Sequence, residues 1–188
     1  KDFTHVNDVN FLNFIQNELF PFMQKNYRVN DFRLLIGHSL GGYFALKTLY
    51  NHPKTFNGYV AHDPSVWFND KELLNLYQNV ENHSFENRFL MITQVGESQN
   101  ADHLRDHYQS IKKVDERLKS SKNKSLNYHY KQYIDEEHGS VPMIGSIDYL
   151  RWQFDGYRVN IKEIPNQPNL VKDSFETISR KLNYSFQP

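Results

Sequence analysis

The chain has 188 residues, and its 22 Lys and Arg residues balance its 22 Asp and Glu residues. This length suits one domain with a substantial core, and the neutral charge argues against a dedicated nucleic-acid-binding protein, which usually carries a basic face. The absence of cysteine excludes disulfides, thiolate metal ligands and a thiol nucleophile, and no apolar run approaches the roughly 18–20 residues that span a bilayer.

The first half of the chain alternates helical and strand patterns. Residues 8–26 carry apolar side chains at helical spacing, and Pro21 is expected to kink this helix or to end its first part. Residues 32–36 are mostly apolar and are expected to form a strand that is buried on both faces. A helix is expected over 41–50 and a strand over 56–61, which completes a strand–helix–strand unit.

The second half continues this alternation. Its expected elements are, in order, a strand at 89–92, a helix at 101–119, a strand at 126–134, and helices at 143–153 and about 173–183. In the last helix, Asp173 and Glu176 have the spacing of a capping box. Strands that alternate with helices predict an α/β architecture with a mainly parallel sheet flanked by helices.

The segment Gly37-His38-Ser39-Leu40-Gly41 has the pattern G-x-S-x-G between an expected strand and an expected helix. In a nucleophile elbow the serine occupies a strained turn, and side chains two positions away would collide with the neighbouring strand and helix, so glycine fits there. Ser39 is therefore the predicted nucleophile, and the amide of Leu40 is the expected first donor of an oxyanion hole. The competing interpretation is a glycine-rich turn with an incidental serine.

A serine nucleophile needs a base. In hydrolases that carry a nucleophile elbow, the acid follows the serine along the chain and the histidine comes last. The chain has nine histidines, so composition does not choose among them. His138 lies in a loop directly after the last clear strand pattern, beside Gly139, and is the predicted base. The alternative for His138 is a polar loop residue without a catalytic role.

The acid of a triad is expected in the loop after the strand that ends near Gly96. Glu97 directly follows this strand and is the favoured candidate, while Asp102 also suits the N-cap of the next helix. A Ser–His dyad without an acid is the third possibility. Glu136 and Glu137 adjoin His138, but neighbours in an extended loop usually point apart, so we expect them to position the loop or to face solvent.

Two further features have competing interpretations. His103 and His107 lie four residues apart on one expected helix, a spacing that zinc sites use, but no H-E-x-x-H pattern or obvious third ligand accompanies them. A solvated helix face is the expected explanation, and no metal ligand is predicted. Trp67 lies in a loop at the carboxyl end of a strand, where it could line a substrate cleft or simply pack against neighbours.

Four segments carry a family resemblance. They are Gly37-His38-Ser39-Leu40-Gly41-Gly42, Asp63-Pro64-Ser65-Val66-Trp67-Phe68, Gly96-Glu97 and Glu137-His138-Gly139-Ser140-Val141-Pro142. In this order they resemble the putative-esterase family of α/β hydrolases, which includes the enterochelin (siderophore) esterases, esterase D and the antigen-85-type enzymes. The bacterial enterochelin-esterase-like branch is the most similar. The resemblance runs from about residue 10 to 160.

The resemblance implies an α/β-hydrolase fold, Ser39 as nucleophile, His138 as base and a carboxylate near Glu97. It implies a small-molecule ester as substrate and no cofactor. One departure is His62-Asp63, where the family commonly has a serine ahead of Pro-Ser.

An α/β-hydrolase nucleophile normally follows the fifth strand of an eight-stranded sheet, yet only one strand pattern precedes Ser39. We therefore expect residues 1–160 to be the carboxyl part of a hydrolase domain, and 161–188 to be a connector and a C-terminal helix. The expected partner is the missing N-terminal part of the same domain, with its early strands and the second oxyanion donor. The first five residues show no signal peptide, and the lack of cysteine fits a periplasmic or secreted protein as well as a cytoplasmic one.

The sequence thus favours a serine hydrolase that cleaves carboxylic esters through an acyl-enzyme, with siderophore or carbohydrate-linked esters as possible substrates. The alternative from another class is a non-enzymatic binding or scaffold protein that keeps the hydrolase fold. A third hypothesis, a metal hydrolase that uses His103 and His107, is the least favoured.

Overall fold

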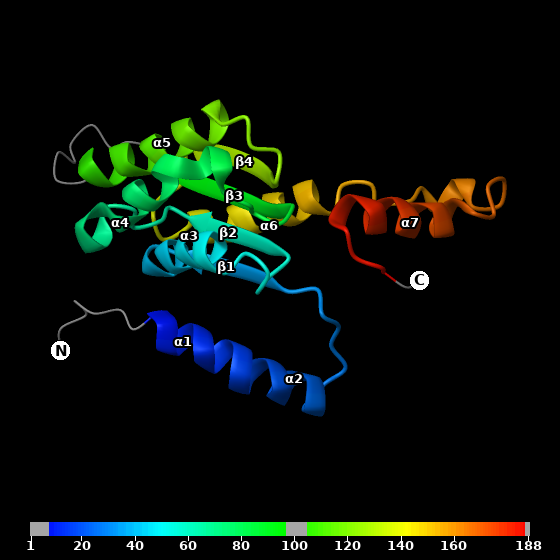
Figure 1. The fold of residues 1–188 in the computed structure, drawn as a ribbon. Coiled ribbons are helices and arrows are strands. Elements are labelled where there is room, and N and C mark those ends of the chain that lie inside the picture. Colours follow the sequence, from blue (N-terminus) through cyan, green and yellow to red (C-terminus); the bar gives the residue numbers. More distant parts are fainter. Residues whose placement is uncertain (1–7, 97–104, 187–188) are drawn as a thin grey trace. The chain divides into compact units, whose positions relative to one another are not determined.

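A computed structural model of the chain describes residues 8–96 and 105–186 (Figure 1). It divides into two units, Lys1–Met143 and Ile144–Pro188. No helix within the described residues is long and apolar enough to cross a bilayer.

The first unit is built around a sheet of four parallel strands in the order β1-β2-β3-β4. These strands are β1 (Leu34–His38), β2 (Gly58–His62), β3 (Arg88–Val95) and β4 (Leu126–Tyr133). Their register aligns His38 with His62 and His62 with Thr93. The carboxyl ends of the first three strands therefore open onto the same edge of the sheet, and loops that follow them can meet there.

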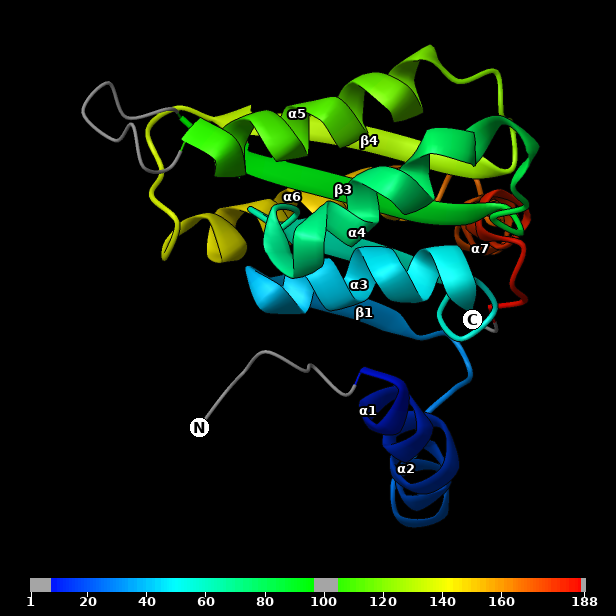
Figure 2. The same ribbon diagram turned by 60° about the vertical axis from the view of Figure 1, so that its left-hand side comes forward.

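Three helices cover one face of this sheet, namely α3 (Leu40–Asn51), α4 (Phe68–Leu76) and α5 (Arg105–Ser120) (Figure 2). A short 3₁₀ helix, η2 (Tyr77–Asn82), follows α4. The core between these layers is apolar and aromatic. Its largest fully buried side chains include Tyr43, Leu46, Tyr59, Leu73, Tyr77, Leu90, Ile92 and Ile111.

The N-terminal helical run spans the expected residues but changes geometry along its length. It consists of α1 (Asp8–Phe14), a wider π turn η1 (Ile15–Leu19) and α2 (Phe20–Asn26). The π turn ends just before Pro21, which lacks the N–H that a continuous α-helix would need at this point. Contacts of Phe11 with Phe44, at 5.2 Å between ring centroids, attach this run to α3.

The strand expected at 32–36 is observed two residues later, at Leu34–His38. The expectation that it is buried on both faces is wrong for the described residues, because Ile36 is 44% exposed. The physical reason is its position, since β1 pairs with β2 along one side and is the outermost strand of the described sheet.

The second unit contains most of α6 (Val141–Gln153), then η4 (Ile161–Glu163) and α7 (Leu170–Leu182). The last helix begins three residues before the expected start. Asp173 is therefore a first-turn residue instead of the N-cap, and its backbone N–H donates to the carbonyl of Asn169, at 2.9 Å. The boundary predicted near residue 160 stays a prediction.

Candidate active site

Ser39 occupies a strained turn between β1 and α3. Its φ of 56° and ψ of −115° place a non-glycine residue in a rarely populated region of backbone space. Three backbone hydrogen bonds hold it there: its N–H donates to His62, at 3.0 Å, and its carbonyl accepts from Tyr43 and Ser65, each at 3.0 Å. The turn thus has the geometry expected of a nucleophile elbow, with α3 beginning at the next residue, Leu40.

The glycines around Ser39 do not share one role. A Cβ atom on Gly37 would lie 2.0 Å from the carbonyl oxygen of Gly41, and one on Gly42 would lie 2.9 Å from the Cβ of Pro64. A Cβ on Gly41 would meet no atom within 4 Å among the described residues. The expected collision two positions before the serine is confirmed, while the one expected two positions after it falls on Gly42 instead.

Asp63 directly follows β2, and its carboxylate is almost completely buried, with 1% of the side chain exposed. Its own backbone has a positive φ of 40°, and its N–H donates to the carbonyl of Thr93, at 2.9 Å. The backbone N–H of Val95 lies 3.4 Å from Oδ1. These contacts to β3 fix the carboxylate at the carboxyl edge of the sheet and leave Oδ2 for other partners.

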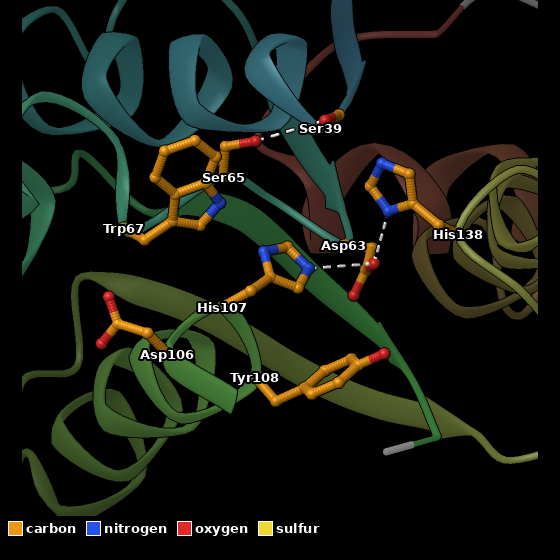
Figure 3. A pocket seen from close by; sticks show the side chains of 8 residues that line it. All are labelled: Ser39, Asp63, Ser65, Trp67, Asp106, His107, Tyr108 and His138. Atoms are coloured by element: carbon orange, nitrogen blue, oxygen red, sulfur yellow. Dashed lines mark hydrogen bonds and ion pairs between the residues drawn. The ribbon is translucent and has the colours of Figure 1, made fainter. Parts of the chain in front are cut away.

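His138 lies in the loop between β4 and α6, as predicted. Its Nδ1 is 2.6 Å from Oδ2 of Asp63, the distance of a strong, charge-assisted hydrogen bond. In Figure 3 the other ring nitrogen, Nε2, points to the side of the ring on which Ser39 lies. A carboxylate that accepts from Nδ1–H leaves the lone pair on Nε2, which is the tautomer that a general base requires.

The loop that carries His138 is held by its own side chains. The hydroxyl of Ser140 donates to Glu136, at 2.5 Å, and accepts from the backbone N–H of Glu137, at 3.0 Å. This is consistent with the expectation that the two glutamates position the loop. The imidazole of His38 also packs against that of His138, at 4.3 Å between ring centroids.

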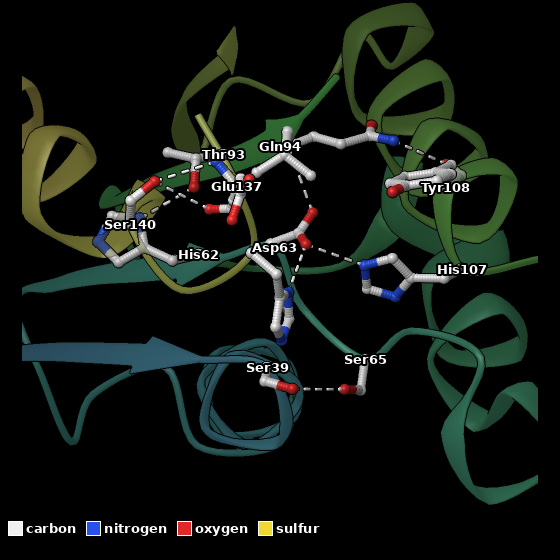
Figure 4. Close-up of polar contacts among 12 residues, drawn as sticks. Ser39, His62, Asp63, Ser65, Thr93, Gln94, His107, Tyr108, Glu137 and Ser140 are labelled. Carbon is white, nitrogen blue, oxygen red and sulfur yellow. Dashed lines mark hydrogen bonds and ion pairs between the residues drawn. The ribbon is translucent and has the colours of Figure 1, made fainter. Parts of the chain in front are cut away.

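His107, expected on a solvated helix face, is instead buried beside the same carboxylate. Its Nε2 lies 3.1 Å from Oδ2 of Asp63, and 9% of the residue is exposed. The fully buried Gln94 of β3 donates to the carbonyl of Tyr108, at 3.1 Å (Figure 4), which ties the first turn of α5 to the sheet. The helical spacing of His103 and His107 could not show this, because it says nothing of which face α5 turns inward; His103 lies outside the described residues.

Burial raises the pKa of the Asp63 carboxyl, but hydrogen bonds from His107 and His138 outweigh this effect and hold the pKa below its ordinary value. Asp63 is therefore ionised at neutral pH. His62, just before it, is fully buried, and burial together with the nearby His38 lowers the pKa of its imidazole to about 4. His62 is neutral, with its Nδ1 2.9 Å from the hydroxyl of Thr93.

Ser39, Asp63 and His138 line a cavity of about 430 Å³ (Figure 3). Its lining residues are Ser39, Asp63, Ser65, Trp67, Asp106, His107, Tyr108 and His138. The structure places Trp67 in the wall of this cavity, with 46% of the residue exposed. The hydroxyl of Ser65 lies 3.2 Å from that of Ser39.

The structure places three of the predicted site residues, Ser39, Trp67 and His138, in the lining of one cavity. No hydrogen bond joins Ser39 directly to His138 within the part of the chain that the structure describes. Glu97 and Asp102, the predicted candidates for the acid, lie outside the described residues. Asp63 was missed as a partner of His138, although its place directly after a strand at the carboxyl edge was a signal that the sequence offered.

Comparison with known proteins identifies relatives for most of the chain. The family described as putative esterase matches residues 5–155. A siderophore triacetylfusarinine C esterase of Aspergillus fumigatus is 32% identical over 123 residues, which are 60% of this chain and 42% of that protein. A siderophore enterobactin esterase of Emericella nidulans is 27% identical over 154 residues, which are 70% of this chain and 51% of that protein.

The fold has a counterpart in a crystal structure of an IroE-like serine hydrolase from Shewanella oneidensis. The two superpose with a TM-score of 0.77 at 27% identity, over 96% of this chain and 57% of the other. The four parallel strands and their covering helices are therefore an α/β-hydrolase fold. The chain spans about half the length of the first two curated relatives, 42% and 51%.

Proposed function

Because the chain belongs to the putative-esterase family, we propose that it carries the nucleophile and base of a serine hydrolase that cleaves carboxylic esters. One observation carries this proposal. The strained Ser39 and the imidazole of His138 line the same cavity, and the buried carboxylate of Asp63 accepts from Nδ1 of that imidazole. This is the constellation that acyl transfer needs, recognised by geometry and not by position in the chain.

In the proposed reaction, Oγ of Ser39 attacks the ester carbonyl while Nε2 of His138 takes the hydroxyl proton. The negative charge that develops on the carbonyl oxygen is stabilised by the N–H of Leu40 at the start of α3. The tetrahedral intermediate collapses as His138 returns its proton to the leaving alcohol. Water then attacks the acyl-enzyme with His138 again as base, which releases the acid and restores Ser39.

We assign the role of the acid to Asp63, which is not among the acids predicted from the sequence. Its carboxylate is ionised, buried and 2.6 Å from Nδ1 of His138, so it can fix the tautomer and stabilise the imidazolium. The acid then follows the second described strand, not the third, where Glu97 is expected. The second donor of the oxyanion hole is expected from the part of the domain that precedes this chain.

The substrate that we propose is an ester of a siderophore. The support is the names of two relatives, one an esterase for triacetylfusarinine C and one for enterobactin. The exposed ring of Trp67 gives the cavity an apolar wall beside Ser39, against which an aromatic or acyl group of such a substrate can pack.

The test is labelling of the full-length protein with a fluorophosphonate, together with turnover of p-nitrophenyl acetate. Ser39→Ala should abolish labelling and lower kcat by about 10⁴–10⁶. Ser84→Ala, which changes an exposed serine far from the cavity, is the matched control and should label like the wild type.

If Ser39→Ala still labels or keeps its turnover, the nucleophile is another residue. If the folded wild-type protein neither labels nor turns over any ester, the non-enzymatic binding protein becomes the better interpretation. A comparison of siderophore esters with simple acyl esters on the wild type tests the substrate class separately.

A further inference from the structure

We propose that the site also binds a divalent cation of the Zn²⁺ type through Asp63, His107 and His138, and that this cation inhibits the hydrolase. The inhibition rests on the proposed function, whereas the binding does not. One imidazole nitrogen from each histidine and a carboxylate oxygen of Asp63 lie within 4.8 Å of one another. Two imidazoles and a carboxylate are a common ligand set for zinc, with the fourth position left to water.

The two nitrogens already lie close to the same carboxylate oxygen. His107 Nε2 and His138 Nδ1 lie 3.1 Å and 2.6 Å from the same oxygen, Oδ2 of Asp63. Ligands placed tetrahedrally at about 2.0–2.1 Å from zinc lie about 3.3 Å from one another. The contact of His107 is therefore close to the required spacing, and the contact of His138 must lengthen by about 0.7 Å.

The surroundings allow His138 to move but hold Asp63 and His107 in place. His138 is in a loop, and 49% of its side chain is exposed, so its ring can move outward. Asp63 and His107 are buried and tied to β3 through Val95 and Gln94. The site thus offers two fixed ligands and one that can adjust, and hydrogen bonds to ligands from outside the metal's own shell favour binding.

Binding at Nδ1 of His138 has a direct consequence for Ser39. A neutral imidazole carries one proton, and a metal that takes the lone pair of Nδ1 leaves that proton on Nε2. Nε2 then has no lone pair for the hydroxyl of Ser39, so the base is lost without any change in the nucleophile. Asp63 also stops accepting a hydrogen bond from His138, since its Oδ2 then binds the cation.

The first experiment measures binding without relying on activity. Full-length protein with Ser39→Ala is titrated with ZnCl₂ by calorimetry, and one high-affinity site is expected. Adding His107→Gln should weaken this affinity by at least about 10–100-fold, while His52→Gln, which changes an exposed histidine, should leave it unchanged. Asp63→Asn, a second variant of nearly the same shape, should weaken it similarly, and circular dichroism checks that each variant is folded.

The second experiment measures inhibition of the wild-type hydrolase. Zn²⁺ should inhibit p-nitrophenyl acetate turnover with a constant that matches the calorimetric affinity, and EDTA should restore the rate. Mg²⁺, which prefers oxygen ligands, should have no effect at the same concentration. Whatever activity His107→Gln retains should need at least about tenfold more Zn²⁺ for the same inhibition.

The site is refuted if Ser39→Ala binds no Zn²⁺, or if folded His107→Gln and Asp63→Asn both bind it as tightly as their parent. Binding without inhibition of an active wild type overturns the inhibitory role. If the wild type proves inactive on every ester, the proposed function fails, and the calorimetric result still decides the metal site.

Discussion

Asp63 contacts both histidines of the site. Its Oδ2 accepts from both His138 and His107, so one carboxylate charge serves two imidazoles. An ionised, buried carboxylate is costly unless hydrogen bonds compensate it, and these two bonds explain why its pKa stays low despite burial. A change at this residue should therefore affect catalysis far more than a change at an acidic residue elsewhere in the cavity wall.

We predict that Asp63→Asn lowers kcat for p-nitrophenyl acetate by about 10⁴, with a much smaller effect on KM. Asparagine keeps the shape but presents no charge, so it neither selects the productive tautomer of His138 nor stabilises the imidazolium. The matched variant is Glu97→Gln, at the position where the acid was expected, and it should stay within a few-fold of the wild type. A large loss in Glu97→Gln with a small loss in Asp63→Asn would move the acid to Glu97.

A second residue-scale prediction concerns stability in acid. His62 has a pKa of about 4 in the folded chain, against an ordinary value of 6.5. Below pH 6.5 the imidazole of His62 is protonated in the unfolded chain, whereas in the folded chain it stays neutral until about pH 4. The free energy of unfolding therefore falls as the pH falls from 6.5 to 4. Between pH 7.5 and 5.0 the wild type should lose about 2 kcal/mol more unfolding free energy than His62→Gln.

The measurement is urea denaturation of both proteins at the two pH values. Only the difference in pH dependence matters, since the variant can also change stability at both values. Equal losses in the two proteins would mean that His62 does not resist protonation as its burial implies.

At the scale of elements, the turn from β1 into α3 depends on one glycine more than on the others. Gly37→Ala would place a Cβ atom 2.0 Å from the carbonyl of Gly41, which only a displacement of the strand or the helix can relieve. We predict a loss of about 3 kcal/mol in stability, the upper end of the usual cost of overpacking, because the atom that the new Cβ meets belongs to the backbone. Fluorophosphonate labelling of Ser39 should be lost as well.

Gly41→Ala is the matched control, because its Cβ would meet no atom of the described residues within 4 Å. Alanine is also favoured over glycine inside a helix by about 1 kcal/mol, so its melting temperature should equal or exceed that of the wild type. Equal melting temperatures for both variants would show that the elbow relaxes more easily than its geometry suggests.

The elements were more predictable than the contacts between them. Apolar runs and strand-like alternation located the four strands of the described sheet, because burial imposes these patterns on the sequence. The positions of Ser39 in a strand-to-helix turn and of His138 in the loop after β4 were also predictable, since glycine spacing and position after a strand mark them locally. The partnership of Asp63 with His107 was not, because it joins the end of β2 to a buried face of α5, and 44 residues separate the two in the chain.

At the scale of the whole molecule, β1 forms an exposed, apolar edge of the described sheet. It is the outermost strand of the described sheet, and Ile36 is 44% exposed. An apolar groove of about 590 Å³ lies beside it, between β1 and the N-terminal helical run. An exposed strand with free backbone groups and apolar neighbours favours pairing with another strand. The β1 edge of the described sheet is therefore open to pairing with a further strand.

The isolated 188-residue chain should consequently self-associate as its concentration rises, with a growing mass by size-exclusion chromatography and light scattering. Ile36→Lys places a charge on the edge strand and should reduce this association while the circular dichroism spectrum stays the same. Ile161→Lys, at an exposed isoleucine of the second unit, is the matched control and should associate like the wild type. A chain that remains a monodisperse monomer at every concentration, with or without the lysine, would show that the β1 edge needs no partner.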